Sequence, residues 1–266
     1  MQDTQAPVLA DFLGRLGTAP SSILLLDYDG TLAPFQTRRD QAYPYPGVVC
    51  ILESIMQCGK TRVIVITGRP VSEVQALLSP LSNFEIWGAH GLEHLLADGT
   101  YRQAAIASDV SKGLAEAEQW LKTSGLSSRS EVKPGGVAVH WRGLSDAEIE
   151  KVRASTRKGW GALAKHPGLK LLDFEGGLEL RAAHPDKGDA IAEILRDLDP
   201  NVQIAFLGDD LTDEDGFRVL GDRGLSVLVR SEYRETNAKA WLRPPDELVA
   251  FFEQWMHCTS YPAPIR

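Results

Sequence analysis

Short, mostly apolar runs recur through the first eighty residues, and each is followed by a segment with apolar residues at helical spacing. The runs at 23–26 and 62–66 are typical of strands buried on both faces, as in a parallel sheet covered by helices. The segments at 46–58 and 71–78 have the periodicity of helices, and Gly59 is a typical stop for the first of them. This alternation of strand and helix predicts a doubly wound α/β sheet.

The pattern changes between residues 106 and 181. A helical segment is followed there by two strands around a glycine-containing turn, and the same order then repeats. The expected helices are 106–121 and 145–165, and the expected strands are 130–133, 137–141, 169–174 and 178–181. The order αββαββ predicts an antiparallel sheet with helices on one face, rather than an extension of the parallel sheet. We therefore interpret residues 104–182 as an inserted α+β cap domain.

Strand and helix alternate again after the insert. The expected elements are a helix after Lys187, a strand at 204–207, a helix from about Thr212, a strand at 225–229 and a helix at 246–255. We expect residues 1–103 and 183–266 to form one Rossmann-like, doubly wound core that the cap interrupts.

Carboxylates gather where two of the predicted parallel strands end. One strand runs into Asp27-Tyr28-Asp29-Gly30-Thr31, and another runs into Gly208-Asp209-Asp210, with Asp213 three residues further on. Ligands of open α/β sheets bind beyond the carboxyl ends of the strands. Converging carboxylates repel unless a cation lies between them, and a hard divalent ion such as Mg²⁺ meets that need. Either motif alone is commonly a turn or an acidic helix start, but both at buried strand ends favour a metal-dependent site.

Two further segments suit phosphate binding. Thr67, Gly68 and Arg69 close the strand at 62–66 and offer a hydroxyl and backbone N–H groups at the same edge of the sheet. Lys187 opens the helix after the insert, where an ammonium group can offset charge on a transferring phosphoryl group. A threonine–glycine pair is also an ordinary strand end and a lone lysine is usually solvated, so both depend on the neighbouring carboxylates for this interpretation.

Taken in chain order, the segments that begin at Asp27, Thr67, Lys187 and Gly208 resemble the four ordered motifs of the haloacid dehalogenase superfamily. The resemblance implies that Asp27 attacks phosphorus and forms an aspartyl-phosphate. It implies that Asp29 is the general acid for the leaving hydroxyl and then the base for water. It also implies that Thr67 and Lys187 hold the phosphoryl group.

The same resemblance implies a Mg²⁺ ion. Its ligands would be the Asp27 carboxylate, the backbone carbonyl of Asp29, and Asp209. Asp213 would order a metal-bound water, and Asp210 is the alternative carboxylate for that position.

A closer resemblance is to the trehalose-6-phosphate phosphatases. It is carried by Asp27-Tyr28-Asp29-Gly30-Thr31-Leu32-Ala33-Pro34, Gly88-Ala89-His90-Gly91-x-Glu93, Gly208-Asp209-Asp210-x-Thr212-Asp213-Glu214-Asp215, Glu131-Val132-Lys133, Val139-His140-Trp141-Arg142 and Gly177-Leu178-Glu179-Leu180-Arg181. The family's usual His-Tyr-Arg reads His-Trp-Arg here. The sugar contacts that the resemblance implies are His90, Glu93, Lys133, His140, Arg142, Glu179 and Arg181. Alternatively, the cap residues pair across an exposed sheet, and His90 and Glu93 brace the hinge.

Composition and charge narrow the class of protein. The net charge of −8 argues against non-specific binding of nucleic acid, which needs a basic surface. The three cysteines show no metal-binding spacing, so we expect free thiols in a reducing compartment. No apolar run approaches the roughly 20 residues of a membrane span. We therefore expect a cytoplasmic protein without nucleic-acid or membrane partners.

We expect a Mg²⁺-dependent phosphatase that hydrolyses trehalose 6-phosphate, the last step of trehalose biosynthesis. The near alternatives are phosphatases for sucrose phosphate or for glucosyl- or mannosylglycerate phosphate. A phospho-accepting signalling module is a further alternative, which Asp29 and the cap disfavour. A catalytically inactive homologue is disfavoured because every motif residue is present.

Overall fold

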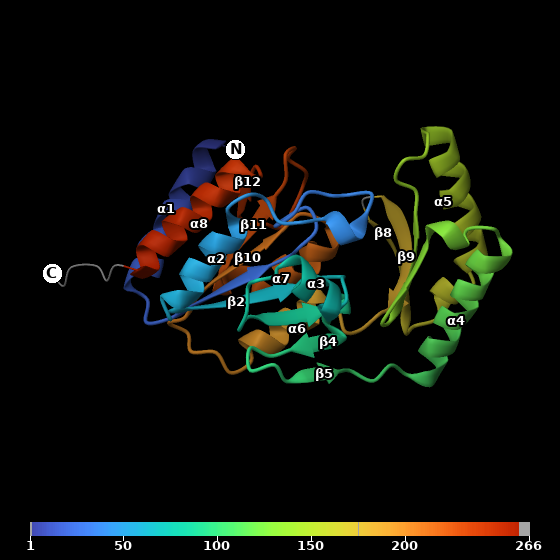
Figure 1. Ribbon diagram of the computed structural model, residues 1–266, viewed down its shortest axis with the longest axis horizontal. Helices are drawn as coiled ribbons and strands as arrows, with labels where there is room; N and C mark the ends of the chain where they lie inside the picture. The colour runs from blue at the N-terminus through green and yellow to red at the C-terminus, as the bar shows by residue number, and fades with distance from the viewer. Residues whose placement is uncertain (1, 175, 261–266) are drawn as a thin grey trace.

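The structure is a computed structural model that describes residues 2–174 and 176–260 (Figure 1). Its larger sheet has eight strands in the order β12-β11-β10-β1-β2-β3-β4-β5. The bounds are β1 Ser22–Leu26, β2 Thr61–Ile66, β3 Glu85–Gly88, β4 Glu93–Leu95, β5 Tyr101–Gln103, β10 Gln203–Gly208, β11 Leu225–Val229 and β12 Ala240–Leu242. Strands β12 to β3 pair in parallel, and β4 and β5 extend the sheet in antiparallel pairing. The predicted Rossmann-like core is confirmed.

Helices cover both faces of this sheet, as the continuous apolar strands require. The helices are α1 Gln2–Thr18, α2 Val48–Gln57, α3 Val71–Leu77, α6 Lys187–Leu195, α7 Glu214–Leu220 and α8 Asp246–Ser260. Leu24 and Leu26 pack in one cluster with α1, α2, α3 and α8. Ile23 and Leu25 pack on the opposite face with α6 and α7. Each fully buried side chain of this kind contributes about 1.5–3 kcal/mol of transfer free energy, so β1 is held from both sides.

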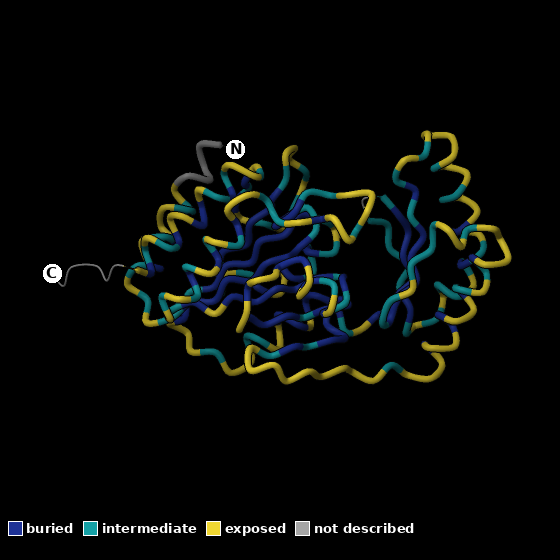
Figure 2. The backbone as a smooth tube through the Cα atoms, in the orientation of Figure 1, coloured by how far each residue is buried: buried dark blue, intermediate teal, exposed yellow. Residues whose placement is uncertain are grey.

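The segment between β5 and α6 forms a second, separate sheet. Its four antiparallel strands lie in the order β6-β7-β9-β8. The bounds are α4 Ser108–Thr123, β6 Ser130–Lys133, β7 Gly136–His140, α5 Asp146–Trp160, β8 Leu169–Phe174 and β9 Gly177–Ala182. Helices α4 and α5 pack on the side of this sheet away from the core (Figure 1). Figure 2 shows buried backbone in two zones, one along the core strands and one along these strands. The predicted αββαββ order is confirmed, and we call this part the cap.

The structure differs from the expected elements at several boundaries. The second cap helix ends at Trp160, and a short 3₁₀ turn at Leu163–Lys165 replaces its expected last turn. Helix α1 and the short strands β4, β5 and β12 were not predicted. Pro7 lies inside α1, and β5 is exposed at all three residues, so neither shows the pattern typical of its class. No helix in the described part of the chain is long and apolar enough to cross a membrane.

Candidate active site

The candidate active site lies where β1 and β10 end side by side. Parallel pairing aligns Leu26 of β1 with Leu207 of β10, so the residues that follow both strands share one edge of the sheet. One carboxylate oxygen from each of Asp27, Asp209 and Asp213 lies within 4.8 Å of the others. All three side chains are buried. The two acidic segments of the sequence therefore meet in one cluster.

Lys187 is the cation of this cluster. It is the first residue of α6, and its Nζ lies 2.6 Å from both Asp27 Oδ1 and Asp213 Oδ1. The start of α6 is fixed by two reciprocal hydrogen bonds of a helix capping box. The Asp186 carboxylate accepts a hydrogen bond from the Asp189 amide (3.0 Å), and the Asp189 carboxylate accepts one from the Asp186 amide (2.8 Å). These two hydrogen bonds at the start of α6 thus set the direction in which the Lys187 side chain enters the cluster.

The charges of the cluster do not balance. Burial raises the pKa of Asp27 to about 7, although Lys187 lowers it. Burial, with the nearby Asp27 and Asp213 charges, raises the pKa of Asp209 well above its usual range. Burial would lower the pKa of Lys187, but the Asp213 and Asp27 carboxylates outweigh it and raise that pKa. Among the described residues, the buried Asp209 Oδ2 has no hydrogen-bond partner. Three carboxylates around one ammonium group, all with hard oxygen donors, fit a divalent cation.

Backbone contacts hold the acidic loop after β10 in place. Asp213 Oδ2 accepts hydrogen bonds from the amides of Asp209 and Asp210, each at 3.0 Å. Arg234 donates to the carbonyl oxygens of the same two residues at 3.2 and 2.8 Å. Gly30 has φ +84°, and a Cβ there would lie 2.2 Å from Asp209 Oδ2. Only glycine lets the loop after β1 come this close to the loop after β10.

Thr67, Gly68 and Arg69 follow β2 at the same edge of the sheet. Thr67 is buried, and its Oγ1 accepts a hydrogen bond from the Arg69 amide at 3.2 Å. A Cβ at Gly68 would lie 2.6 Å from the His90 ring, so glycine allows that ring to approach. Arg69 Nε and Nη2 donate to the two carboxylate oxygens of Asp29 at 2.6 and 2.7 Å. Arg69 is one of the residues that the sequence assigns to phosphate binding, and in this structure its guanidinium pairs with Asp29.

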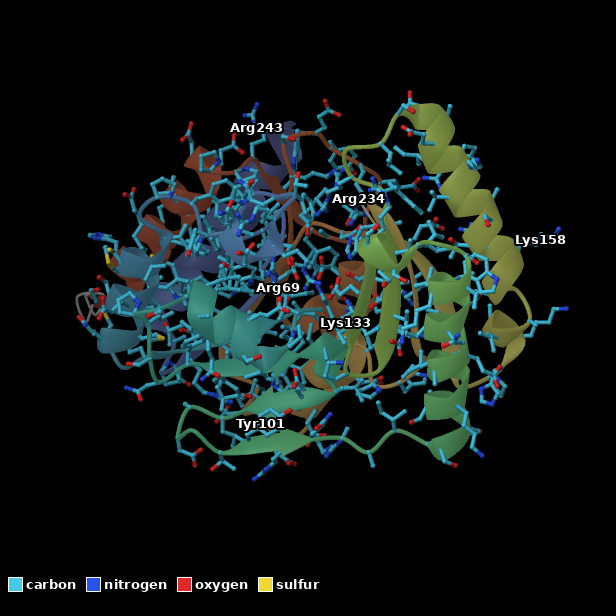
Figure 3. The ribbon with its side chains drawn as sticks, turned by 45° about the vertical axis from the view of Figure 1, so that its right-hand side comes forward. Arg69, Tyr101, Lys133, Lys158, Arg234 and Arg243 are labelled. Atoms are coloured by element: carbon cyan, nitrogen blue, oxygen red, sulfur yellow. The ribbon has the colours of Figure 1, made fainter. Side chains whose placement is uncertain are left out.

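The cap sheet presents a second polar group to the core. Glu179 Oε1 lies 2.7 Å from Lys133 Nζ, and Glu179 Oε2 lies 3.3 Å from His90 Nε2 of the core. His140 Nε2 lies 2.7 Å from Glu131 Oε2. Figure 3 shows Lys133 between the cap strands and the core. Both histidines are thus close to a carboxylate.

Burial sets the charge states of this polar group. It lowers the pKa of His90 to about 3 and that of His140 to about 4, so both imidazoles are neutral at pH 7. Burial would raise the pKa of Glu179, but Lys133 and His90 hold it well below its usual range. A neutral imidazole both donates and accepts, a carboxylate accepts and an ammonium donates. The group therefore offers donors and acceptors together, as a polyhydroxylated ligand requires.

A cavity of about 110 Å³ lies between the core and the cap. The sequence-predicted residues that line it are Asp27, Asp29, Thr67, Gly68, Arg69, His90, Lys133, His140, Arg142, Glu179, Lys187 and Asp209. Glu93, Arg181 and Asp213 do not line it. Glu93 accepts hydrogen bonds from the Val71 amide (2.9 Å) and the Tyr101 hydroxyl (2.7 Å), which suits the bracing alternative. Arg181 is buried on β9, and Asp213 lies behind Lys187.

Other residues complete the lining without having been assigned to the site from the sequence. They are Phe35, Arg39, Glu131, Phe174 and Thr212. Asp210, which the sequence offers as the alternative carboxylate of the metal site, lines the cavity as well. Glu131 and Thr212 stand inside the motifs quoted above, so that signal was present. Phe35 lies under the guanidinium of Arg142, 4.6 Å from ring centre to Cζ, and Arg39 pairs with Glu131 of the cap. No local pattern marks Phe35 or Arg39, because the path of the loop after β1 brings them to the cavity.

A parallel core with a buried Asp–Lys–Asp cluster at the end of β1 and an inserted cap has the architecture of the haloacid dehalogenase superfamily. A haloacid dehalogenase-like hydrolase from B. subtilis has this fold, with a TM-score of 0.62 over 87% of this chain and 99% of that one at 14% identity. The sequence profile of the family described as Trehalose-phosphatase matches residues 25–246. The chain belongs to the trehalose-phosphatase family.

Individual relatives agree with this assignment. The trehalose-phosphate phosphatase of Mycobacterium ulcerans is 30% identical over 94% of this chain, and the match spans 66% of the relative. A probable trehalose-phosphate phosphatase of Arabidopsis thaliana is 28% identical over 87% of this chain and 76% of its own length. The C-terminal domain of C. albicans trehalose-6-phosphate phosphatase has the same fold, with a TM-score of 0.81 at 19% identity, covering 94% and 96% of the two chains. The chain therefore spans just under two thirds of the mycobacterial relative's length.

Proposed function

We propose that this chain is a Mg²⁺-dependent phosphatase that hydrolyses trehalose 6-phosphate to trehalose and phosphate, the last step of trehalose biosynthesis. The observation that carries the proposal is the buried Asp27–Lys187 pair, at 2.6 Å, at the bottom of a cavity with a polar cap surface. Family membership and the names of the relatives support the choice of substrate. That the protein acts in the cytoplasm stays a prediction.

The proposed chemistry has two steps. In the first, an Asp27 oxygen attacks phosphorus and the bond from phosphorus to the sugar oxygen breaks, while Asp29 gives that oxygen a proton. In the second, Asp29 takes a proton from water as the water oxygen attacks phosphorus. The bond from phosphorus to the Asp27 oxygen breaks, which releases phosphate and restores the Asp27 carboxylate. Thr67 and Lys187 hold the phosphoryl oxygens through both steps, and Lys187 offsets the charge that develops on them. Gly68 and Arg69 border the same position.

The metal proposed for this site is Mg²⁺. The Asp27 and Asp209 carboxylates and the backbone carbonyl of Asp29 would hold it, with Asp213 or Asp210 ordering its water. When bound, the ion would neutralise the carboxylates and polarise the phosphoryl group. The unpartnered Asp209 Oδ2 and the excess negative charge of the cluster support this assignment.

We assign the sugar to the cap side of the cavity. His90, Lys133, His140, Arg142 and Glu179 line it there and would hold the disaccharide hydroxyls. Glu93 and Arg181, which do not line the cavity, would support these side chains from behind. We propose that residues 1–103 and 183–266 are the core that carries the reaction and that residues 104–182 are the cap. A cap that closes on the sugar excludes water from the reaction.

A panel of sugar phosphates tests the proposal. Phosphate release is measured for trehalose 6-phosphate, sucrose phosphate and glucosyl- and mannosylglycerate phosphates, each with Mg²⁺ and with EDTA. We expect the highest kcat/KM for trehalose 6-phosphate and loss of turnover with EDTA. A better substrate elsewhere in the panel would overturn the substrate assignment. A stable phospho-Asp27 without turnover would instead support a signalling module.

A further inference from the structure

A continuous series of ion pairs joins the cap to Asp29. Glu131 of β6 pairs with Arg39 of the core, and Arg39 Nη2 lies 3.2 Å from Glu73 Oε2. The same Glu73 oxygen lies 3.2 Å from Arg69 Nη1, and Arg69 pairs with Asp29. We call these five side chains the Glu131–Asp29 series. It leads from a cap strand to the carboxyl group beside the proposed nucleophile.

Arg69 is the most constrained member of the series. Its side chain is 3% exposed, and its Cζ lies 5.4 Å above the centre of the Tyr28 ring. Its Nη1 donates to Glu73 and to the carbonyl oxygen of Arg39 (3.0 Å), and its Nε and Nη2 both donate to Asp29. All three guanidinium nitrogens are therefore engaged within the protein.

The paired Asp29 has few other constraints. Its side chain is 31% exposed, and the other described hydrogen bonds do not involve its carboxylate. A planar guanidinium that donates to both oxygens of a carboxylate fixes its orientation as well as its place. Without Arg69, the Asp29 carboxyl group would be free to turn among its rotamers.

We propose that Arg69 is a positioning residue for Asp29, and that Glu131 and Arg39 make this positioning depend on a closed cap. The inference rests on the proposed function, in which Asp29 protonates the sugar oxygen. As the Asp27–phosphorus bond forms and the phosphorus–sugar oxygen bond breaks, the proton passes from Asp29 to the sugar oxygen. The carboxylate left on Asp29 is the form that accepts both hydrogen bonds from Arg69. When the cap moves away, Arg39 loses its ion pair with Glu131. Arg39 then holds Glu73 less firmly, and Glu73 in turn holds Arg69 less firmly.

The alternative is that Arg69 is a ligand of the phosphoryl group. The two roles differ in how they depend on the leaving group. A sugar alkoxide needs a proton in order to leave, whereas p-nitrophenolate leaves without one. Loss of a positioning residue should therefore affect the sugar phosphate selectively, but loss of a phosphate ligand should affect both substrates alike.

The experiment compares kcat/KM for trehalose 6-phosphate and p-nitrophenyl phosphate in Arg69→Met. The parameter kcat/KM extends only to the first irreversible step, so it leaves out the later attack of water. Since general acid catalysis contributes about 10²–10⁴-fold, we expect a loss of at least ~10-fold with the sugar phosphate. With p-nitrophenyl phosphate we expect a loss below ~3-fold, because that leaving group gains little from general acid catalysis. Arg69→Lys keeps the charge and a single donating nitrogen in place of the guanidinium fork. It should show an intermediate, equally selective loss and serves as the second variant if the methionine variant folds poorly.

Two more variants test the link to the cap. Glu131→Gln should show the same selectivity with a smaller loss, and combining it with Arg69→Met should add nothing, because both changes act through one series. Arg38→Met removes a neighbouring exposed arginine and should leave both substrates unchanged. Equal losses with both substrates, a faster Arg69→Met enzyme, or additive losses in the double variant would overturn the inference. If the unmodified enzyme hydrolyses neither substrate, the proposed function itself fails; if it hydrolyses both, the inference is judged alone.

Discussion

At the scale of single residues, the Lys187 ammonium group lies between two buried carboxylates, Asp27 and Asp213. Replacing it by methionine keeps much of the side-chain volume and removes the charge. Loss of one such electrostatic stabiliser typically lowers kcat by about 10²–10³-fold, and we expect a loss of that size in steady-state assays. Lys158→Met is the matched control, because Lys158 is exposed on α5 away from the cavity (Figure 3). A loss below ten-fold in Lys187→Met would contradict the role given to this lysine.

The raised pKa of Asp27 has a consequence for stability without metal. The pKa is about 7 in the folded protein against 3.8 for an ordinary aspartate, so between these values the folded state binds more protons than the unfolded state. Stability therefore falls as pH rises from about 4 to 7 and levels off above that range. We expect the melting temperature of the EDTA-treated protein to fall across this window. Because Mg²⁺ would replace the bound proton, its stabilising effect should be larger at pH 8 than at pH 5.5.

The variant Asp27→Asn separates the contribution of Asp27 from the pH dependence of stability that other titrating groups cause. An amide in place of the carboxyl group does not titrate, so the pH dependence between 4 and 7 should become shallower. The same variant should fold and have no turnover, because the proposed nucleophile is missing. An unchanged pH profile would assign the effect to other groups, with Asp209 the first candidate because its pKa is also raised.

Single residues were predictable where strand ends carry them. Asp27 and Asp209 follow buried apolar runs. Parallel pairing brings the ends of such strands together independently of the conformation of the loops. Arg39 and Phe35 reach the cavity only because a long loop folds back over it. The pairing of Arg69 with Asp29 also depends on side-chain placement, which the motif alone does not specify.

At the scale of elements, the first turn of α6 connects stability to the site. Asp186→Ala removes the side chain that caps α6, and losses of this kind typically cost about 1 kcal/mol of unfolding free energy. We also expect kcat to fall, because the same turn directs Lys187. Ser145→Ala is the matched control, since Ser145 occupies the corresponding position of the capping box of α5. It should lower stability in urea unfolding by a similar amount and leave kcat unchanged; equal effects of both variants on kcat would contradict the argument.

Elements with strong periodicity or continuous apolar runs were predicted, and short polar ones were not. Strand β1 is buried at every position, so its continuous apolar sequence is typical of a central strand covered on both faces. Strand β5, Tyr101–Gln103, is exposed throughout and pairs only at the edge of the sheet. Its structure depends on β4 next to it rather than on its own residues. Helix α1 forms in spite of Pro7, because Phe12 and Leu16 are buried in the main core.

At the scale of the whole molecule, αββαββ order predicted a second sheet but not how it faces the core. That arrangement depends on contacts between distant residues, such as His90 with Glu179 and Arg39 with Glu131. The connections at 104–107 and 183–186 lie outside regular strands and helices. Two such connections and a largely polar contact surface are typical of a cap that moves as a unit.

The size of the cavity predicts that this motion is required. The cavity encloses about 110 Å³, whereas small-molecule sites usually measure about 300–1,000 Å³. A disaccharide phosphate needs more room than this arrangement provides, and we expect the cap to move away from the core to provide it. We expect the ligand-free protein in solution to have a larger radius of gyration by small-angle X-ray scattering than the arrangement in Figure 1. Trehalose 6-phosphate added with Mg²⁺ to the Asp27→Asn variant, which should bind it without turnover, should reduce the radius.

Glu179→Gln provides the comparison for this experiment. It keeps the shape of the side chain but weakens its pairing with Lys133 and His90, so in the Asp27→Asn background the ligand should compact the protein less. We expect inorganic phosphate, which carries no sugar to contact the cap, to cause little compaction. If the radius is the same with and without trehalose 6-phosphate while binding is measurable by calorimetry, the cap does not move as a unit. Entry would then have to occur through side-chain rearrangement at the edge of the cavity, where Phe35 and Arg142 stack.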